Sequence, residues 1–148
     1  MISEKLVKAF NDQIVAELWS SNLYLQMAFY LKKEGWNGAA NWMLRQSGEE
    51  KEHALKLADY AIKRGGEVKV GMIDVVPDGW GSLLDVFQNV YEHECHVSAR
   101  LAVEPPVERP LRREHAHHAR LRTEGRRLHR RLHHDYRSEE RRVGKECR

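Results

Sequence analysis

Residues 4–33, EKLVKAFNDQIVAELWSSNLYLQMAFYLKK, carry the strongest structural signal in this sequence. Its inward-facing side chains recur at spacings of three and four, which predicts one long amphipathic helix. The line consists of Leu6, Phe10, Ile14, Glu17, Ser21, Tyr24, Ala28 and Leu31. Glu17 falls in its middle, and an ionised carboxylate in a core must be paired, hydrogen-bonded or bound to metal.

A second helix is predicted over residues 38–64, where the same spacing returns. We expect Asn37 to cap its start and Gly65–Gly66 to end it. Its inward line consists of Met43, Gln46, Glu50, His53, Leu57 and Tyr60. Because residues three apart share a helix face, Glu50 and His53 can bind one ion together.

Residues 66–81 show no helical period and are rich in Gly and β-branched residues. About sixteen irregular residues are long for a turn between helices and favour a crossover along a helical bundle. A third helix is predicted from residue 82, where Ser82 and Asp85 have the spacing of a capping box. Its inward line consists of Leu84, Phe87, Tyr91, Glu94 and Ser98.

Each of the three predicted helices therefore carries an inward Glu, and one adds a His. Carboxylate oxygens with an imidazole nitrogen suit iron, manganese or zinc, and this combination recurs at dinuclear sites in four-helix bundles. In the simplest arrangement, Glu17 and His53 bind one ion, Glu94 binds a second, and Glu50 bridges them.

A structural role is the alternative for these acids. An inward Glu can hydrogen-bond to Tyr24 or Gln46 and only hold the helices together, in which case melting would not depend on metal. Glu49, beside Glu50, fits an accessory ligand and a solvated helix face equally well.

Four segments carry a resemblance to a known family: residues 16–43 (AELWSSNLYLQMAFYLKKEGWNGAANWM), 49–66 (EEKEHALKLADYAIKRGG), 73–82 (IDVVPDGWGS) and 90–98 (VYEHECHVS). In them, the chain resembles the bacterial non-haem ferritins. The resemblance implies an all-α, ferritin-like four-helix bundle with a long crossover between its second and third helices. It also implies iron storage, a dinuclear ferroxidase centre that oxidises Fe(II) with dioxygen or peroxide, and a homo-oligomeric shell of 24 subunits.

The resemblance also implies roles for individual residues. It assigns Glu17, Glu50 and His53 to the first iron, Glu94 to the second with Glu50 bridging, Tyr24 to a place beside the centre, and Glu49 to a third iron site. No haem is expected, because the second helix lacks an inward Met at the matching place.

The last third of the chain differs in kind from the rest. Residues 1–98 hold 10 basic and 14 acidic residues, net −4, whereas residues 99–148 hold 15 basic and 8 acidic residues, net +7. Where the family's fourth helix supplies ligands to the second iron, this chain has Arg126, Arg127 and Arg130. We therefore expect the fourth helix to be missing or replaced by an unrelated Arg-rich tail, and ferroxidase activity to be impaired.

Three interpretations of residues 99–148 compete. The first is a shifted reading frame or another artefact, which fits the abrupt change of composition. The second is a basic DNA-binding arm, which would make the chain a non-enzymatic relative of the miniature ferritins. The third is a solvated helix over residues 111–136. The pair Glu114 and His117 is not counted as a ligand set, because no apolar stripe surrounds it.

The remaining features indicate a cytoplasmic protein. The start of the chain lacks the apolar core of a secretory signal. No run of about 18 apolar residues exists, and two Cys are too few for a disulfide scaffold. We expect no membrane or nucleic-acid partner, with the DNA-binding arm kept as the alternative.

Overall fold

The computed structural model describes residues 2–103, which form three α-helices and no strand. The helices are α1 (Glu4–Lys33), α2 (Asn37–Lys63) and α3 (Leu83–Val103). The all-α fold predicted from the sequence is confirmed for this range. The predictions for the fourth helix, the helix over 111–136, the three arginines and the Glu114–His117 pair lie outside the described residues.

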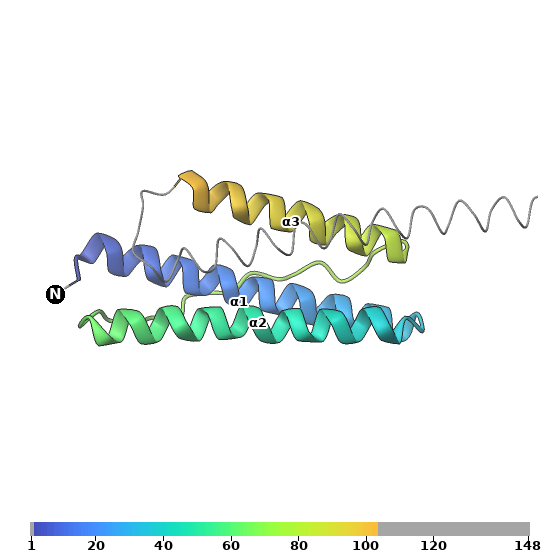
Figure 1. The fold of residues 1–148 in the computed structure, drawn as a ribbon, viewed down its shortest axis with the longest axis horizontal. Helices are drawn as coiled ribbons and strands as arrows, with labels where there is room; N and C mark the ends of the chain where they lie inside the picture. Colours follow the sequence, from blue (N-terminus) through green and yellow to red (C-terminus); the bar gives the residue numbers. More distant parts are fainter. Residues whose placement is uncertain (1, 104–148) are drawn as a thin grey trace, which may run out of the picture. The chain divides into compact units, whose positions relative to one another are not determined.

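Helices α1 and α2 form an antiparallel pair (Figure 1). At one end, the backbone N–H of Ile2 donates to the carbonyl of Arg64 at 3.3 Å. Farther along, the rings of Tyr24 and Trp42 meet edge to face, with centroids 6.4 Å apart. The predicted inward lines of these two helices are confirmed except at Leu6 and Tyr60, which are only half-buried. The buried members are Phe10, Ile14, Glu17, Ser21, Tyr24, Ala28, Leu31, Met43, Gln46, Glu50, His53 and Leu57.

Both helices end on a glycine with positive φ. Gly35 has φ +84° and Gly65 has φ +77°. In each case, the N–H of the glycine and the N–H of the residue after it donate to carbonyls near the end of the helix, which is a Schellman motif. The expected stop at Gly65 is confirmed. The expected cap at Asn37 is wrong, because α2 already includes Asn37 and is preceded by Trp36 without a side-chain cap.

The connection after α2 is irregular from Gly66 to Gly79, as predicted. The side chain of Asn11 on α1 fastens its first part. Its amide donates to the carbonyl of Glu67 and its oxygen accepts from the N–H of Lys69, both at 3.1 Å. A Cβ on Gly71 would lie 3.6 Å from Val15. This part of the connection therefore runs along α1 and parallel to it.

The chain divides into two compact units, Met1–Gly79 and a second that starts at Trp80 and contains α3. The predicted capping pair is present directly before and within α3. The N–H of Asp85 donates to Oγ of Ser82 at 3.2 Å, and the Ser82 hydroxyl donates to the Asp85 carboxylate at 2.7 Å. Along α3, the side chains of Val86, Phe87, Val90 and Glu94 are buried.

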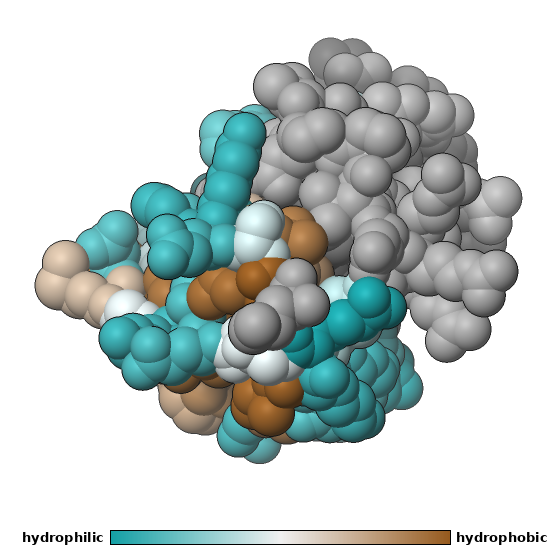
Figure 2. All heavy atoms as spheres, turned by 90° about the vertical axis from the view of Figure 1, so that its left-hand side faces the viewer, coloured by the Kyte–Doolittle hydropathy of each residue, from teal (hydrophilic) through white to brown (hydrophobic). Residues whose placement is uncertain are grey.

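The surface mixes polar and apolar side chains. Figure 2 looks at the end where α1 starts, and there hydrophilic residues are interrupted by apolar ones. The large apolar side chains that are exposed on the described residues are Phe29, Trp36, Leu55, Ile62, Val70, Met72 and Val75. Within residues 2–103, no helix is long and apolar enough to cross a membrane.

Candidate metal centre

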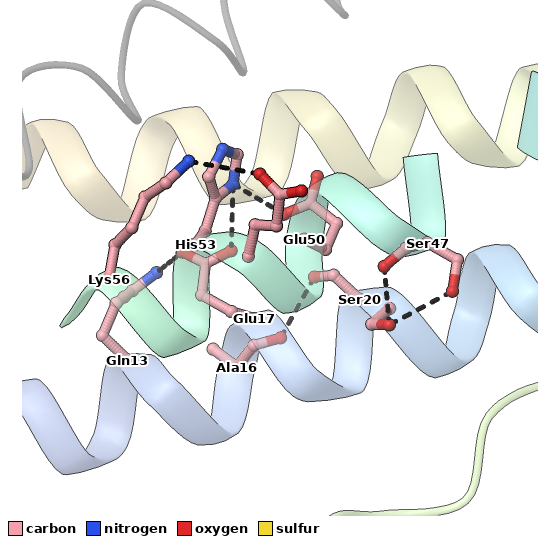
Figure 3. Close-up of polar contacts among 10 residues, drawn as sticks. Gln13, Ala16, Glu17, Ser20, Ser47, Glu50, His53 and Lys56 are labelled. Carbon is pink, nitrogen blue, oxygen red and sulfur yellow. Dashed lines mark hydrogen bonds and ion pairs between the residues drawn. The ribbon is translucent and has the colours of Figure 1, made fainter. Parts of the chain in front are cut away.

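Glu17 lies in the middle of α1 and faces α2. Its side chain is only 1% exposed. One turn earlier on the same helix, the amide nitrogen of Gln13 donates a hydrogen bond of 2.7 Å to Oε1 of Glu17. Glu17 is thus a buried carboxylate held from one side by a neutral donor (Figure 3).

Glu50 and His53 lie one turn apart on α2. Glu50 is 0% exposed and His53 is 9% exposed. Nδ1 of His53 lies 3.3 Å from Oε2 of Glu50 and 4.0 Å from Oε2 of Glu17. The predicted sharing of one helix face by Glu50 and His53 is confirmed, and their neighbour on α1 is the third member of the group.

Each of these three residues offers one ligand atom, and these atoms all lie within 4.8 Å of one another. Two atoms bound to one ion at about 2.1 Å lie at most about 4.2 Å apart, so small side-chain rotations would bring the three onto one ion. The antiparallel pairing of α1 with α2 makes this group, because it joins residues 33 or more positions apart in the sequence.

The charges of the group favour a cation. Two ionised carboxylates repel each other, and burial prevents water from screening them. A protonated His53 would compensate only one of the two negative charges. A divalent ion would compensate both and would give His53 a metal to bind through its neutral ring. The group can therefore hold a metal, with two oxygens and one nitrogen as donors.

A second polar contact joins the helices one turn from these acids. The hydroxyl of Ser21 donates to the backbone carbonyl of Ser47 at 2.8 Å and lies 3.1 Å from the Ser47 hydroxyl. Ser20, its neighbour, donates instead to the carbonyl of Ala16 within α1 (Figure 3). The Ser21–Ser47 contact is a polar contact between the two helices beside the acids.

The three-residue group does not include the other predicted site residues. Tyr24 is buried two turns after Glu17 and packs on Trp42. Glu49 is exposed on α2. Glu94 is 0% exposed on α3. Their parts in a site stay predictions.

Sequence reasoning missed Gln13. It lies four residues before Glu17, which is the spacing at which helical side chains meet, so a signal was present. Ile14 precedes Glu17 by three residues and is also buried, so the spacing alone does not show which of the two side chains contacts Glu17.

Comparisons with known proteins agree with the sequence and the fold. A family model described as the ferritin-like domain matches residues 7–103. The bacterial non-heme ferritin of Bacteroides fragilis (strain 638R) is 63% identical over 98 residues, which are 66% of this chain and 62% of that protein. A probable bacterial non-heme ferritin-like protein of Haemophilus influenzae is 35% identical over 101 residues, 68% of this chain and 61% of that protein.

Among solved structures, an open-pore ferritin from the hyperthermophilic archaeon Archaeoglobus fulgidus superimposes with a TM-score of 0.83 at 35% identity. The match covers 90% of this chain and 88% of that one. The chain spans about three fifths of the length of the curated relatives described above.

Proposed function

The chain belongs to the ferritin family, and from this premise we propose that it binds Fe(II) at Glu17, Glu50 and His53, oxidises it to Fe(III) and stores the product. The observation that carries the proposal is the buried group whose three ligand atoms lie within 4.8 Å of one another. Iron is here the substrate and the cargo.

The donor set supports oxidation as well as binding. Carboxylate oxygens are hard donors and bind Fe(III) more tightly than Fe(II), so they lower the cost of removing an electron from the bound ion. The imidazole of His53 suits iron in both states. These residues would bind the ion and stabilise its oxidised form.

A second ion would complete the chemistry. We extend the proposal to Glu94 as a ligand of that ion, with Glu50 bridging, because Glu94 is a buried acid on α3 and the resemblance to the bacterial non-haem ferritins assigns it this role. Two Fe(II) ions would give two electrons to one dioxygen or peroxide molecule. In this proposal, Tyr24 stands beside the centre, and the exposed Glu49 belongs to a third site from which iron leaves.

Assembly into a homo-oligomeric shell is part of the same proposal. Exposed apolar side chains on the connection support it, since Met72 is 85% exposed and Val75 is 94% exposed. Contiguous exposed apolar groups are typical of surfaces that bind another protein, and in this proposal Met72 and Val75 contribute to such a surface. Sedimentation of the full chain measures this directly, and a monomer at micromolar concentration would contradict shell formation.

The test of the iron site compares two neighbouring acids. Fe(II) is added to the full chain without oxygen, oxygen is admitted, and Fe(III) formation is followed by absorbance. Glu50→Gln should slow oxidation by at least about tenfold, the size that changes around a metal site commonly reach. Glu52→Gln is the matched control, because Glu52 is exposed and forms a surface ion pair with Lys56 at 3.4 Å.

Oxidation at the wild-type rate in Glu50→Gln would overturn the proposal. His53→Ala should reproduce the loss, because it removes the only nitrogen donor of the group. A purely structural role for the acids predicts a different result, namely equal melting temperatures with and without metal.

A further inference from the structure

Gln13 is a buried polar residue that the proposed chemistry does not use directly. Gln13 is only 6% exposed, and its amide nitrogen donates a hydrogen bond of 2.7 Å to Oε1 of Glu17. A buried amide is costly unless hydrogen bonds compensate it. The contact therefore restrains both side chains, and Figure 3 shows that it approaches Glu17 from the side of α1.

This bond makes the two oxygens of Glu17 inequivalent. Oε1 accepts from Gln13, whereas Oε2 lies 4.0 Å from Nδ1 of His53. A hydrogen bond to an ionised carboxylate is stronger than one between neutral groups, and it opposes rotation of the carboxylate. Oε2 is therefore the oxygen of Glu17 that faces His53, and His53 in turn contacts Glu50.

We propose that Gln13 is a positioning residue, which holds Glu17 as a one-oxygen ligand through Oε2. This inference rests on the proposed function, because it presupposes that the group binds a metal. A one-oxygen carboxylate fills one coordination position, whereas a two-oxygen carboxylate fills two. Gln13 would thereby keep a position on a bound ion available to a water molecule or to the oxidant. Outer partners of this kind orient metal ligands in many proteins.

Gln46 provides a matched comparison within the same helical pair. It precedes Glu50 by four residues, as Gln13 precedes Glu17, and it is 5% exposed. Its oxygen Oε1 has no hydrogen-bond partner within residues 2–103. Replacing Gln46 therefore removes a buried amide of equal burial without touching the bond to Glu17.

The test uses Co(II), whose visible absorption reports coordination number and geometry. Co(II) is titrated into the full chain and into Gln13→Met and Gln46→Met. Gln13→Met should bind Co(II) at least about 10-fold more weakly and change the absorption bands. Gln46→Met should keep the wild-type bands. Circular dichroism of each variant checks that its helices are intact. A general loss of packing would change the Co(II) absorption bands of both variants, whereas the proposal expects a change only in Gln13→Met.

Gln13→Asn is a second variant in case Gln13→Met does not fold. Its amide is one methylene shorter and cannot reach Oε1 from the same backbone position, although the residue stays polar. It should therefore behave like Gln13→Met. Wild-type bands and affinity in the folded Gln13 variants would overturn this inference and leave the proposed function standing. A wild-type chain that binds no Co(II) would overturn both.

Discussion

The hydroxyl of Ser21 on α1 donates to the backbone carbonyl of Ser47 on α2 at 2.8 Å, in the buried interface between the two helices. It also lies 3.1 Å from the Ser47 hydroxyl. Both residues sit one turn from an acid of the candidate metal centre, because Ser21 follows Glu17 by four positions and Ser47 precedes Glu50 by three. A polar contact between the helices thus adjoins the site that they share.

The first prediction concerns this contact. Ser21→Ala removes both interactions and should lower the free energy of unfolding by about 1 kcal/mol, the usual net value of a buried hydrogen bond. Ser47→Ala removes only the contact between hydroxyls and should cost less, because the carbonyl still accepts from Ser21. Urea unfolding followed by circular dichroism measures both changes. Equal costs would show that the bond to the carbonyl contributes nothing.

The second prediction compares two glycines. Gly65 has φ +77°, a conformation that is strained for residues with a Cβ, so Gly65→Ala should destabilise the protein by about 1 kcal/mol. Gly48 is exposed within α2, and a Cβ there would meet nothing within 4 Å. Gly48→Ala should therefore stabilise the protein by up to about 1 kcal/mol. Thermal melting distinguishes the two, and shifts of the same sign would contradict the interpretation.

The third prediction links metal to stability. Zn(II) at 100 times its dissociation constant should raise the free energy of unfolding by about 2.7 kcal/mol if it binds only the folded chain. Glu50→Gln should abolish most of this gain. In a chelator, the same variant should be at least as stable as the wild type, because it removes one of two mutually repelling buried charges. Calorimetry with and without Zn(II) tests both signs.

A variant Glu50→Gln that loses stability equally in the two conditions would argue against metal binding at Glu50. It would favour the structural role considered for the inward acids. Glu52→Gln again serves as the control, since its carboxylate is exposed, and it should leave the Zn(II) effect unchanged.

The fourth prediction concerns the connection after α2. Asn11→Ala removes the two bonds that fasten Glu67 and Lys69 to α1. Hydrogen exchange of the Lys69 amide should accelerate, while amides inside α1 and α2 keep their protection. Asn22→Ala is the control, because Asn22 is an exposed residue of the same helix. An unchanged Lys69 amide would show that other contacts hold the connection.

Much of the helical pair could be predicted from sequence because its signals are local. The spacing of three and four placed Glu17, Glu50 and His53 on inward faces, and their burial confirms this. Contacts between helices are different, because they depend on register. The Ser21–Ser47 bond exists only in the antiparallel alignment that the folded chain adopts, and no periodicity within one helix specifies that alignment.

The start of α2 shows a second limit of local patterns. Asn and Gly both favour the ends of helices, so the sequence predicted a cap at Asn37. In the structure, Gly35 has the positive φ with which the chain turns between α1 and α2. Which of several neighbouring residues takes positive φ depends on how the next helix packs. Gln13 illustrates the same limit within the site, since an inward Gln is compatible with many partners and Glu17 is only one of them.

The three-residue turn between α1 and α2 determines when the candidate metal centre can form during synthesis. All three ligands of the described group lie between residues 17 and 53, on two helices that follow each other directly. Contacts that are close in sequence form fastest in folding. Once the ribosome has released the chain through Gly66, the helical pair and its end motifs are complete. If the group binds iron as proposed, the ligands of the first ion would all be in place before α3 has emerged.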